Sequence, residues 1–208
     1  MFLCLFFNFS SCSQKKSEPP SKLGLQRLID GNKRYVNDKS IHPNRNEERR
    51  KEITSKQSPY AVIVGCSDSR VAPEIIFDEG LGDLFVVRVA GNVIGPIELD
   101  SIEYSALYLH SVIILVLGHE NCGAVEAVIQ NNTKDIEAVA NLIEPAVQKA
   151  QEGETNNLLE QAIKINALNM KDFLENSPNI KQLIQDKKIE VHAGYYNLKT
   201  GLVEPLND

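Results

Sequence analysis

The sequence is poor in the features that mark several common functional classes. It has no G-x-G-x-x-G fingerprint, no phosphate-binding loop and no nucleophile elbow, so nothing in it indicates a dinucleotide-binding enzyme, an NTPase or an α/β-hydrolase. Its basic residues are scattered among acidic ones and the net charge is -6, so no surface for nucleic acid is predicted. No internal repeat is visible, and 208 residues with 42% hydrophobic content suit one globular domain.

Long apolar runs are also missing. The apolar stretch at residues 2–9 is far shorter than the roughly 20 residues needed to cross a bilayer, but it is long enough for the core of a signal peptide. The F-S-S-C sequence at residues 9–12 resembles the cleavage motif of bacterial lipoproteins. We therefore expect a signal peptide over residues 1–11, lipidation of Cys12, a flexible tether over residues 12–22 and a location in the cell envelope or periplasm. Because no Lys or Arg precedes the apolar run, a cytoplasmic location is the alternative.

Cysteine and histidine are scarce, and three of these residues stand at informative places. Cys66 ends an apolar run in C-S-D-S-R, and His119 and Cys122 follow a second apolar run in G-H-E-N-C-G. Two thiolates and an imidazole make a tetrahedral zinc site with one open position, the arrangement of catalytic rather than structural zinc. Each residue alone would more often be a structural one, as we expect of His110 and His192, but the combination favours a metal site.

A charged pair follows the first expected ligand. Asp68 and Arg70 stand two and four residues after Cys66. An ionised Asp68, aimed by a charge-assisted pair with Arg70, is placed to accept a hydrogen bond from a water at the metal. An ordinary surface ion pair is worth at most about 1 kcal/mol, but the neighbouring ligand makes a catalytic role for both residues the better interpretation.

The pattern of apolar runs predicts an α/β fold. Three runs are short and rich in apolar, β-branched residues, with Arg88 the only charged residue in them, which is typical of strands buried on both faces. Helical stretches between them imply right-handed crossovers and a parallel sheet with helices on both faces. Such sheets bind ligands at the carboxyl ends of their strands, where Cys66 and His119 fall. The expected strands are residues 60–65, 84–90 and 112–117, and the expected helices are residues 73–78 and 96–110.

The remaining segments complete this prediction. Residues 21–36 carry apolar side chains on one helical face and form an N-terminal helical arm. Residues 135–185 are expected to be mostly helical, with packing and oligomer contacts as their role. A further strand over residues 189–196 enters a hairpin turn at residues 199–201. We thus expect a central, mostly parallel sheet flanked by helices in one domain over residues 23–208.

Three motifs together resemble those of the β-class carbonic anhydrases. They are C-S-D-S-R, G-H-x-x-C-G and the intervening F-x-x-R-x-A-G-N at residues 85–92, and the resemblance extends from about Leu23 to Glu204. It implies one Zn²⁺ per subunit and the reversible hydration of carbon dioxide to bicarbonate and a proton. It also implies a homodimer or homotetramer, because in the family part of the substrate pocket crosses a subunit interface. By motif position, the pocket residues are Gln57, Phe85, Tyr104 and the backbone of Gly123.

One departure from the family pattern concerns regulation. Some members close the site by letting the aspartate bind zinc, and this is linked to a bicarbonate pocket whose tryptophan lies three residues before the first cysteine ligand. Here that position is Ile63, and the chain has no tryptophan at all, although Arg88 matches the arginine of the pocket. We therefore do not expect this regulatory pocket.

Two alternatives stay open at the level of the sequence. The same fold and ligand set can support hydrolysis of carbon disulfide or carbonyl sulfide, and only access to the pocket separates that reaction from hydration. A non-catalytic envelope lipoprotein that binds zinc or bicarbonate would need neither Asp68 nor Arg70, so their presence favours an enzyme. Membrane contact is expected only through the lipid anchor.

Overall fold

A computed structural model describes residues 19–153 and 156–207. The expected signal peptide, Cys12 and residues 12–18 of the expected tether lie outside the described residues and stay predictions. Helix α1 (Pro20–Val36) begins at a proline, which suits a first helical turn, so residues 20–22 are helical. Within the described ranges no helix combines the length and the apolarity needed to cross a membrane.

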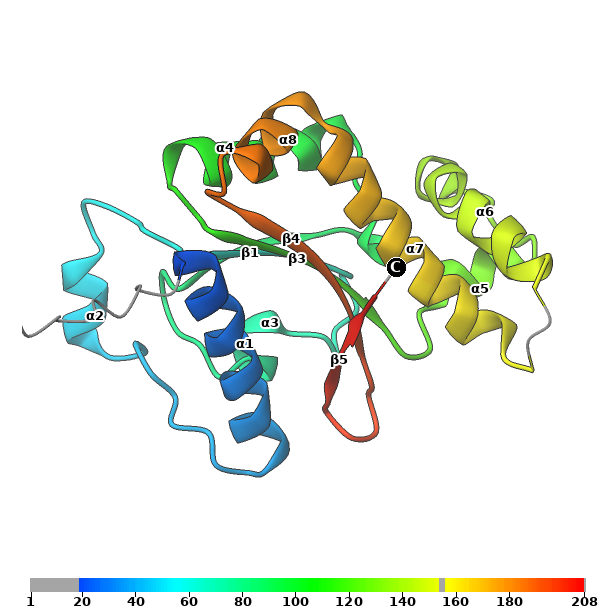
Figure 1. The fold of residues 1–208 in the computed structure, drawn as a ribbon. Coiled ribbons are helices and arrows are strands. Elements are labelled where there is room, and N and C mark those ends of the chain that lie inside the picture. Colours follow the sequence, from blue (N-terminus) through cyan, green and yellow to red (C-terminus); the bar gives the residue numbers. More distant parts are fainter. Residues whose placement is uncertain (1–18, 154–155, 208) are drawn as a thin grey trace, which may run out of the picture.

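One five-stranded sheet forms the centre of the chain (Figure 1). Its order is β2-β1-β3-β4-β5, with every neighbouring pair parallel except β4 and β5, which form an antiparallel hairpin. The mostly parallel α/β sheet expected from the sequence is therefore confirmed. The strands are β1 (Ala61–Gly65), β2 (Leu84–Arg88), β3 (Ile113–His119), β4 (Glu190–Tyr196) and β5 (Val203–Leu206).

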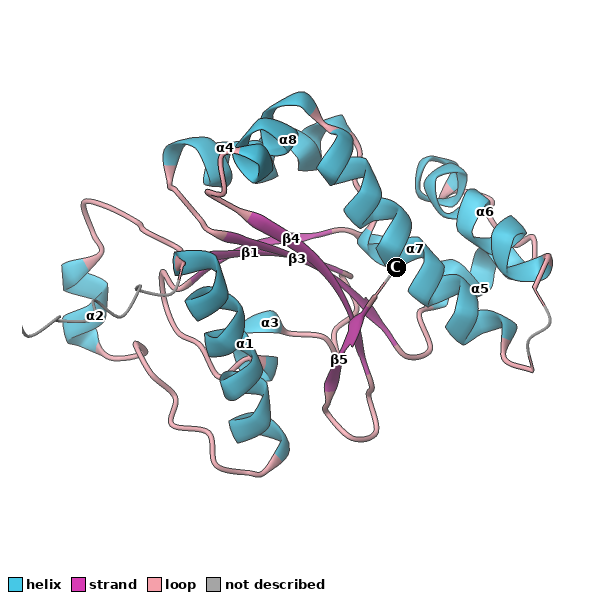
Figure 2. Ribbon diagram, in the orientation of Figure 1, coloured by secondary structure: helices cyan, strands magenta, loops and turns pink. Residues whose placement is uncertain are grey.

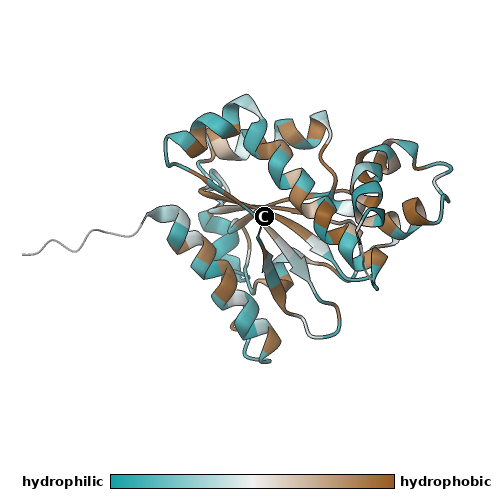
Figure 3. Ribbon diagram, turned by 45° about the vertical axis from the view of Figure 1, so that its right-hand side comes forward, coloured by the Kyte–Doolittle hydropathy of each residue, from teal (hydrophilic) through white to brown (hydrophobic). Residues whose placement is uncertain are grey.

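Helices cover both faces of the sheet (Figure 2). On one face Leu28 of α1 and Ile76 of α3 pack with Ile63 and Leu115 of the strands. The larger core lies on the other face, under α4 to α8, and the central strands between the two layers are largely hydrophobic (Figure 3). The other helices are α2 (Glu47–Glu52), α3 (Pro73–Ile76), α4 (Pro96–Tyr108), α5 (Gly123–Ile129), α6 (Glu137–Gln151), α7 (Leu158–Asn176), α8 (Pro178–Gln185) and the 3₁₀ turn Ala90–Asn92.

The helical arm is attached to the core by buried charges. Asp78 is fully buried and has a φ of 47°, which ends the helical stretch expected over residues 73–78 at Ile76. Its carboxylate accepts hydrogen bonds from Arg34 Nε at 2.6 Å and from the backbone N–H groups of Ile41 and His42. These bonds fix α1 and the segment after it against the end of α3.

Candidate metal centre

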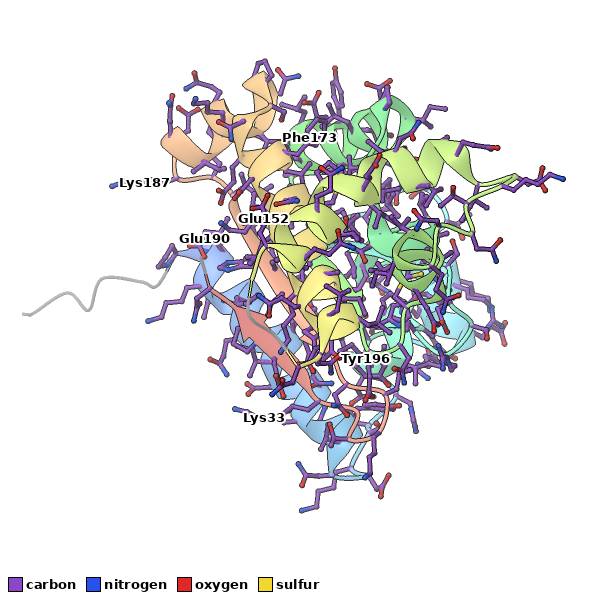
Figure 4. All side chains as sticks on the ribbon, turned by 90° about the vertical axis from the view of Figure 1, so that its right-hand side faces the viewer. Lys33, Glu152, Phe173, Lys187, Glu190 and Tyr196 are labelled. Carbon is purple, nitrogen blue, oxygen red and sulfur yellow. The ribbon has the colours of Figure 1, made fainter. Side chains whose placement is uncertain are left out.

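The three predicted ligands meet at the carboxyl edge of the sheet. Gly65, the last residue of β1, pairs with Leu117 of β3, so Cys66 lies one step beyond β1 and beside the end of β3. His119 is the last residue of β3 and pairs with Tyr196, which is labelled in Figure 4 at the end of β4. Cys122 follows after a turn and immediately precedes α5. The metal-binding atoms of the three residues all lie within 4.8 Å of one another.

The imidazole of His119 is oriented to bind a metal ion. Its Nδ1 lies 2.9 Å from the carbonyl oxygen of Glu120, so the Nδ1–H donates to that carbonyl and Nε2 presents its lone pair. His119 is fully buried, and among the described residues its Nε2 has no hydrogen-bond partner. A buried nitrogen without a partner is costly unless something binds it. A nitrogen beside two sulfur atoms suits Zn²⁺, so the donor set Cys66, His119 and Cys122 fits this metal.

The two thiols of the cluster differ in acidity. A hydrogen bond from the Cys122 thiol, helped by His119 and the Gly91 N–H and opposed by burial, lowers the pKa of Cys66 to about 4. The same hydrogen bond and burial raise the pKa of Cys122. A divalent cation would favour the thiolate form of both residues, since the thiolate is the ligand.

Asp68 is held beside the ligands as a carboxylate. Arg70 forms a two-pronged pair with it, at 2.9 Å to Oδ1 and 2.7 Å to Oδ2, and the Arg70 backbone N–H adds a third bond to Oδ1. This hydrogen bonding from Arg70 lowers the pKa of Asp68 to about 2. The Oδ2 atom lies 3.9 Å from His119 Nε2, so the carboxylate reaches the vicinity of the metal position.

Arg88 supports the loop that carries these residues. Its guanidinium donates to the carbonyl oxygen of Cys66 at 2.9 Å and to that of Asp68 at 2.7 Å. The family motif matches Arg88 only to the arginine of the bicarbonate pocket that some members have. In this chain it fixes the backbone that carries Cys66 and Asp68.

Comparison with known proteins identifies the family of this site. The sequence profile described as carbonic anhydrase matches residues 61–203. The chain belongs to the β-class carbonic anhydrases. One solved member with a similar fold is the β-carbonic anhydrase CcaA, with a TM-score of 0.70 and 26% identity over 88% of this chain and 95% of that one. Another is the Coccomyxa β-carbonic anhydrase in complex with acetazolamide, with a TM-score of 0.66 and 25% identity over 88% of this chain and 86% of that one.

Curated relatives agree with this family assignment. A carbonic anhydrase of Mycolicibacterium smegmatis is 54% identical over 102 residues, which are 49% of this chain and 50% of that protein. The chain thus spans about half the length of the mycobacterial relatives that it matches. A carbonic anhydrase of Pseudomonas aeruginosa is 28% identical over 88% of each chain.

The predicted pocket residues fall into two groups within one β-class chain. Gly123 follows Cys122 directly and lies at the metal centre, as the first residue of α5. Phe85 instead pairs with Val62, four residues before Cys66, which at about 3.3 Å per residue places it about 13 Å away along the sheet. Tyr104 lies near it, with ring centroids 6.4 Å apart. Gln57 and Tyr104 line a surface cleft of about 760 Å³.

Proposed function

We propose that the chain is a zinc-dependent carbonic anhydrase, which hydrates carbon dioxide reversibly to bicarbonate and a proton. The observation that supports this most directly is the buried Cys-His-Cys cluster next to the Asp68–Arg70 pair in a member of the family. Stopped-flow hydration of carbon dioxide, with and without a zinc chelator, tests the proposal. Carbon disulfide and carbonyl sulfide in the same assay test the alternative reaction, and turnover of these substrates alone would reject hydration.

The residues of the chain have separable tasks in this reaction. When bound, Zn²⁺ supplies the Lewis acidity that makes a water nucleophilic, although two thiolates weaken this effect relative to an all-histidine site, where the pKa of that water is about 7. Asp68 Oδ2 is placed to accept a hydrogen bond from the reacting water and to orient it. Arg70 keeps that carboxylate ionised and aimed, and Arg88 holds the loop beneath it.

Hydration activity is expected to rise with pH to a plateau on the alkaline side of neutrality. Two thiolates acidify water at the site less than three imidazoles would. Asp68, whose pKa is about 2, stays ionised throughout this range and adds no inflection of its own. Stopped-flow rates between pH 6 and 9 check this expectation. Asp68→Asn should keep the midpoint of the rise and lower the plateau, and a flat profile of the parent protein would contradict the assigned chemistry.

We also propose that a second copy of the chain completes the substrate pocket. Phe85 and Tyr104 lie too far along the sheet to line the metal centre of their own chain, and Gln57 lines the same surface cleft as Tyr104. The surface that presents them is apolar and exposed: Ile97, Tyr104 and Tyr108 follow one another along one face of α4, with Tyr108 70% exposed. Exposed aromatic residues gathered on one face are typical of protein interfaces.

Tyr108→Glu is expected to give monomers that bind zinc but lose hydration activity by about 10²-fold, since a misplaced pocket costs about that much. The added charge would be buried at the interface, while the metal ligands are untouched. Sedimentation velocity, elemental analysis and stopped-flow rates measure the three properties. Ile41→Glu, at an exposed apolar position in the segment after α1, is the matched control and should change none of them. A fully active monomer of Tyr108→Glu would reject the shared pocket.

A further inference from the structure

Asn166, a buried asparagine on α7, is linked to the metal centre through one intervening residue, Gly91. Asn166 is fully buried, and its Nδ2 donates to the carbonyl oxygen of Gly91 at 2.8 Å. Among the described residues its Oδ1 has no hydrogen-bond partner. Burying an amide with one end unsatisfied is unfavourable, and the buried α7 residues one turn away on either side, Ile163 and Met170, are apolar. The bond to Gly91 is therefore the interaction that accounts for a polar residue at this position.

Gly91 is in turn bonded to a metal ligand. Its backbone N–H donates to Cys66 Sγ at 3.2 Å. The residue has a φ of 69°, a conformation that favours glycine, and an added Cβ would lie 2.6 Å from Ile143 Cδ1, so the isoleucine would have to shift. Asn92, which follows it, also has a positive φ, of 47°. Two successive left-handed residues make a backbone shape that the surrounding structure has to stabilise.

These contacts form a chain from α7 to the sulfur of the first ligand. We propose that Asn166 is a positioning residue for the metal centre. By holding the Gly91 carbonyl, it keeps the Gly91 N–H directed at the Cys66 sulfur. A hydrogen bond to a ligand sulfur withdraws electron density from it and fixes its direction, and such outer interactions tune both the affinity and the electronic properties of a metal site. The proposal rests on the zinc binding of the proposed function.

Asn166→Leu tests it, because leucine has a similar branched shape without either amide atom. We expect zinc affinity, measured by competition with a chelator, to fall by about tenfold or more, as is usual when an outer partner of a ligand is lost. With Co²⁺ in place of zinc, the sulfur-to-cobalt absorption band should shift to lower energy, since the sulfur of Cys66 loses its hydrogen bond. The metal-free variant should unfold within a few degrees of the parent, because removal of the unsatisfied Oδ1 partly offsets the loss of the donor to the Gly91 carbonyl.

A control on the same helix gives the opposite combination of results. Leu174 is fully buried on α7, two turns beyond Asn166. Leu174→Ala should lower the unfolding temperature but leave zinc affinity and the cobalt band unchanged. If Asn166→Leu does not fold, Asn166→Ala should show the same loss of affinity and the same band shift.

The outcomes separate this inference from the proposed function. Unchanged zinc affinity and an unchanged cobalt band in both Asn166 variants, with metal bound normally by the parent, would overturn the positioning role alone. A parent protein that binds neither Zn²⁺ nor Co²⁺ would contradict the proposed function, and this inference with it.

Discussion

Asp68→Asn is expected to retain stoichiometric zinc and to hydrate carbon dioxide about 10²-fold or more slowly than the parent, the usual cost of removing one positioned partner of a reacting group. The substitution keeps the shape of the side chain but removes the charge that Arg70 holds in place at 2.7 Å. An amide keeps one carbonyl oxygen, and if that oxygen accepts from Arg70, the NH₂ group faces the water and cannot accept a hydrogen bond from it. The loss should therefore appear in the rate and not in the metal content.

A second carboxylate in the chain provides the control for this experiment. Asp186 also forms an ion pair, with Lys188 at 3.0 Å, and hydrogen bonds from Lys188 and Gln182 lower its pKa. It lies after α8, among residues that take no part in the metal centre. Asp186→Asn should keep the full rate. If Asp68→Asn stays within a factor of about two of the parent, the assigned role of Asp68 is wrong.

The sheet and its position relative to the ligands were predictable from the sequence because they depend on local patterns. Residues 60–65 and 112–117 are continuously apolar runs rich in β-branched residues, which occur in strands buried on both faces. Once both runs are parallel strands of one sheet, Cys66 and His119 must reach the same edge. The prediction was less accurate at the ends of elements. Helix α3 stops at Ile76, because the buried Asp78 turns the backbone to accept hydrogen bonds from Ile41 and His42. These partners are remote in sequence.

The partners of the ligands were not predictable, because they come from distant parts of the chain. Nothing in the residues around Asn166 distinguishes it from an ordinary polar residue of an amphipathic helix, and its partner Gly91 is 75 residues away. The family motif contains Arg88, but it does not predict the bonds of Arg88 to the carbonyls of Cys66 and Asp68. Those bonds depend on how the loop after β1 lies against the end of β2. Backbone acceptors leave no signal in a sequence.

The split of the pocket residues also needed the structure. The family motifs place Gln57, Phe85 and Tyr104 in a substrate pocket without saying which subunit provides them. The pairing of Phe85 with Val62 fixes the distance to Cys66 along the sheet of one chain, and the proposal of a shared pocket rests on that distance. A resemblance between sequences therefore transfers the identity of a residue more readily than its place in the assembly.

The largest effect is expected from the ligands themselves: Cys66→Ser, His119→Ala and Cys122→Ser should each leave the protein with far less than one zinc per chain. In the described structure the donor atoms of three side chains cluster at the metal position, and the carboxylate of Asp68 beside them is held by Arg70. The loss of affinity should exceed the 10- to 100-fold cost of removing an outer partner of a ligand. Hydration activity should fall with the metal content, in contrast to Asp68→Asn, which loses rate alone.

Elemental analysis of the purified variants measures this loss, and thermal unfolding shows whether the fold survives. Both cysteines are at most 5% exposed, so their replacement has to keep the sheet edge packed. Serine does this because it differs only in having oxygen in place of sulfur and fills nearly the same volume. The matched control is His192→Ala. His192 lies on β4, and its Nε2 is 3.1 Å from the carboxylate of Glu190, which begins that strand, whereas Tyr196 beside the metal centre ends it. It should keep its zinc. A variant of Cys66, His119 or Cys122 that also keeps stoichiometric zinc would show that its side chain is not a ligand, and the donor set proposed for this centre would then be wrong.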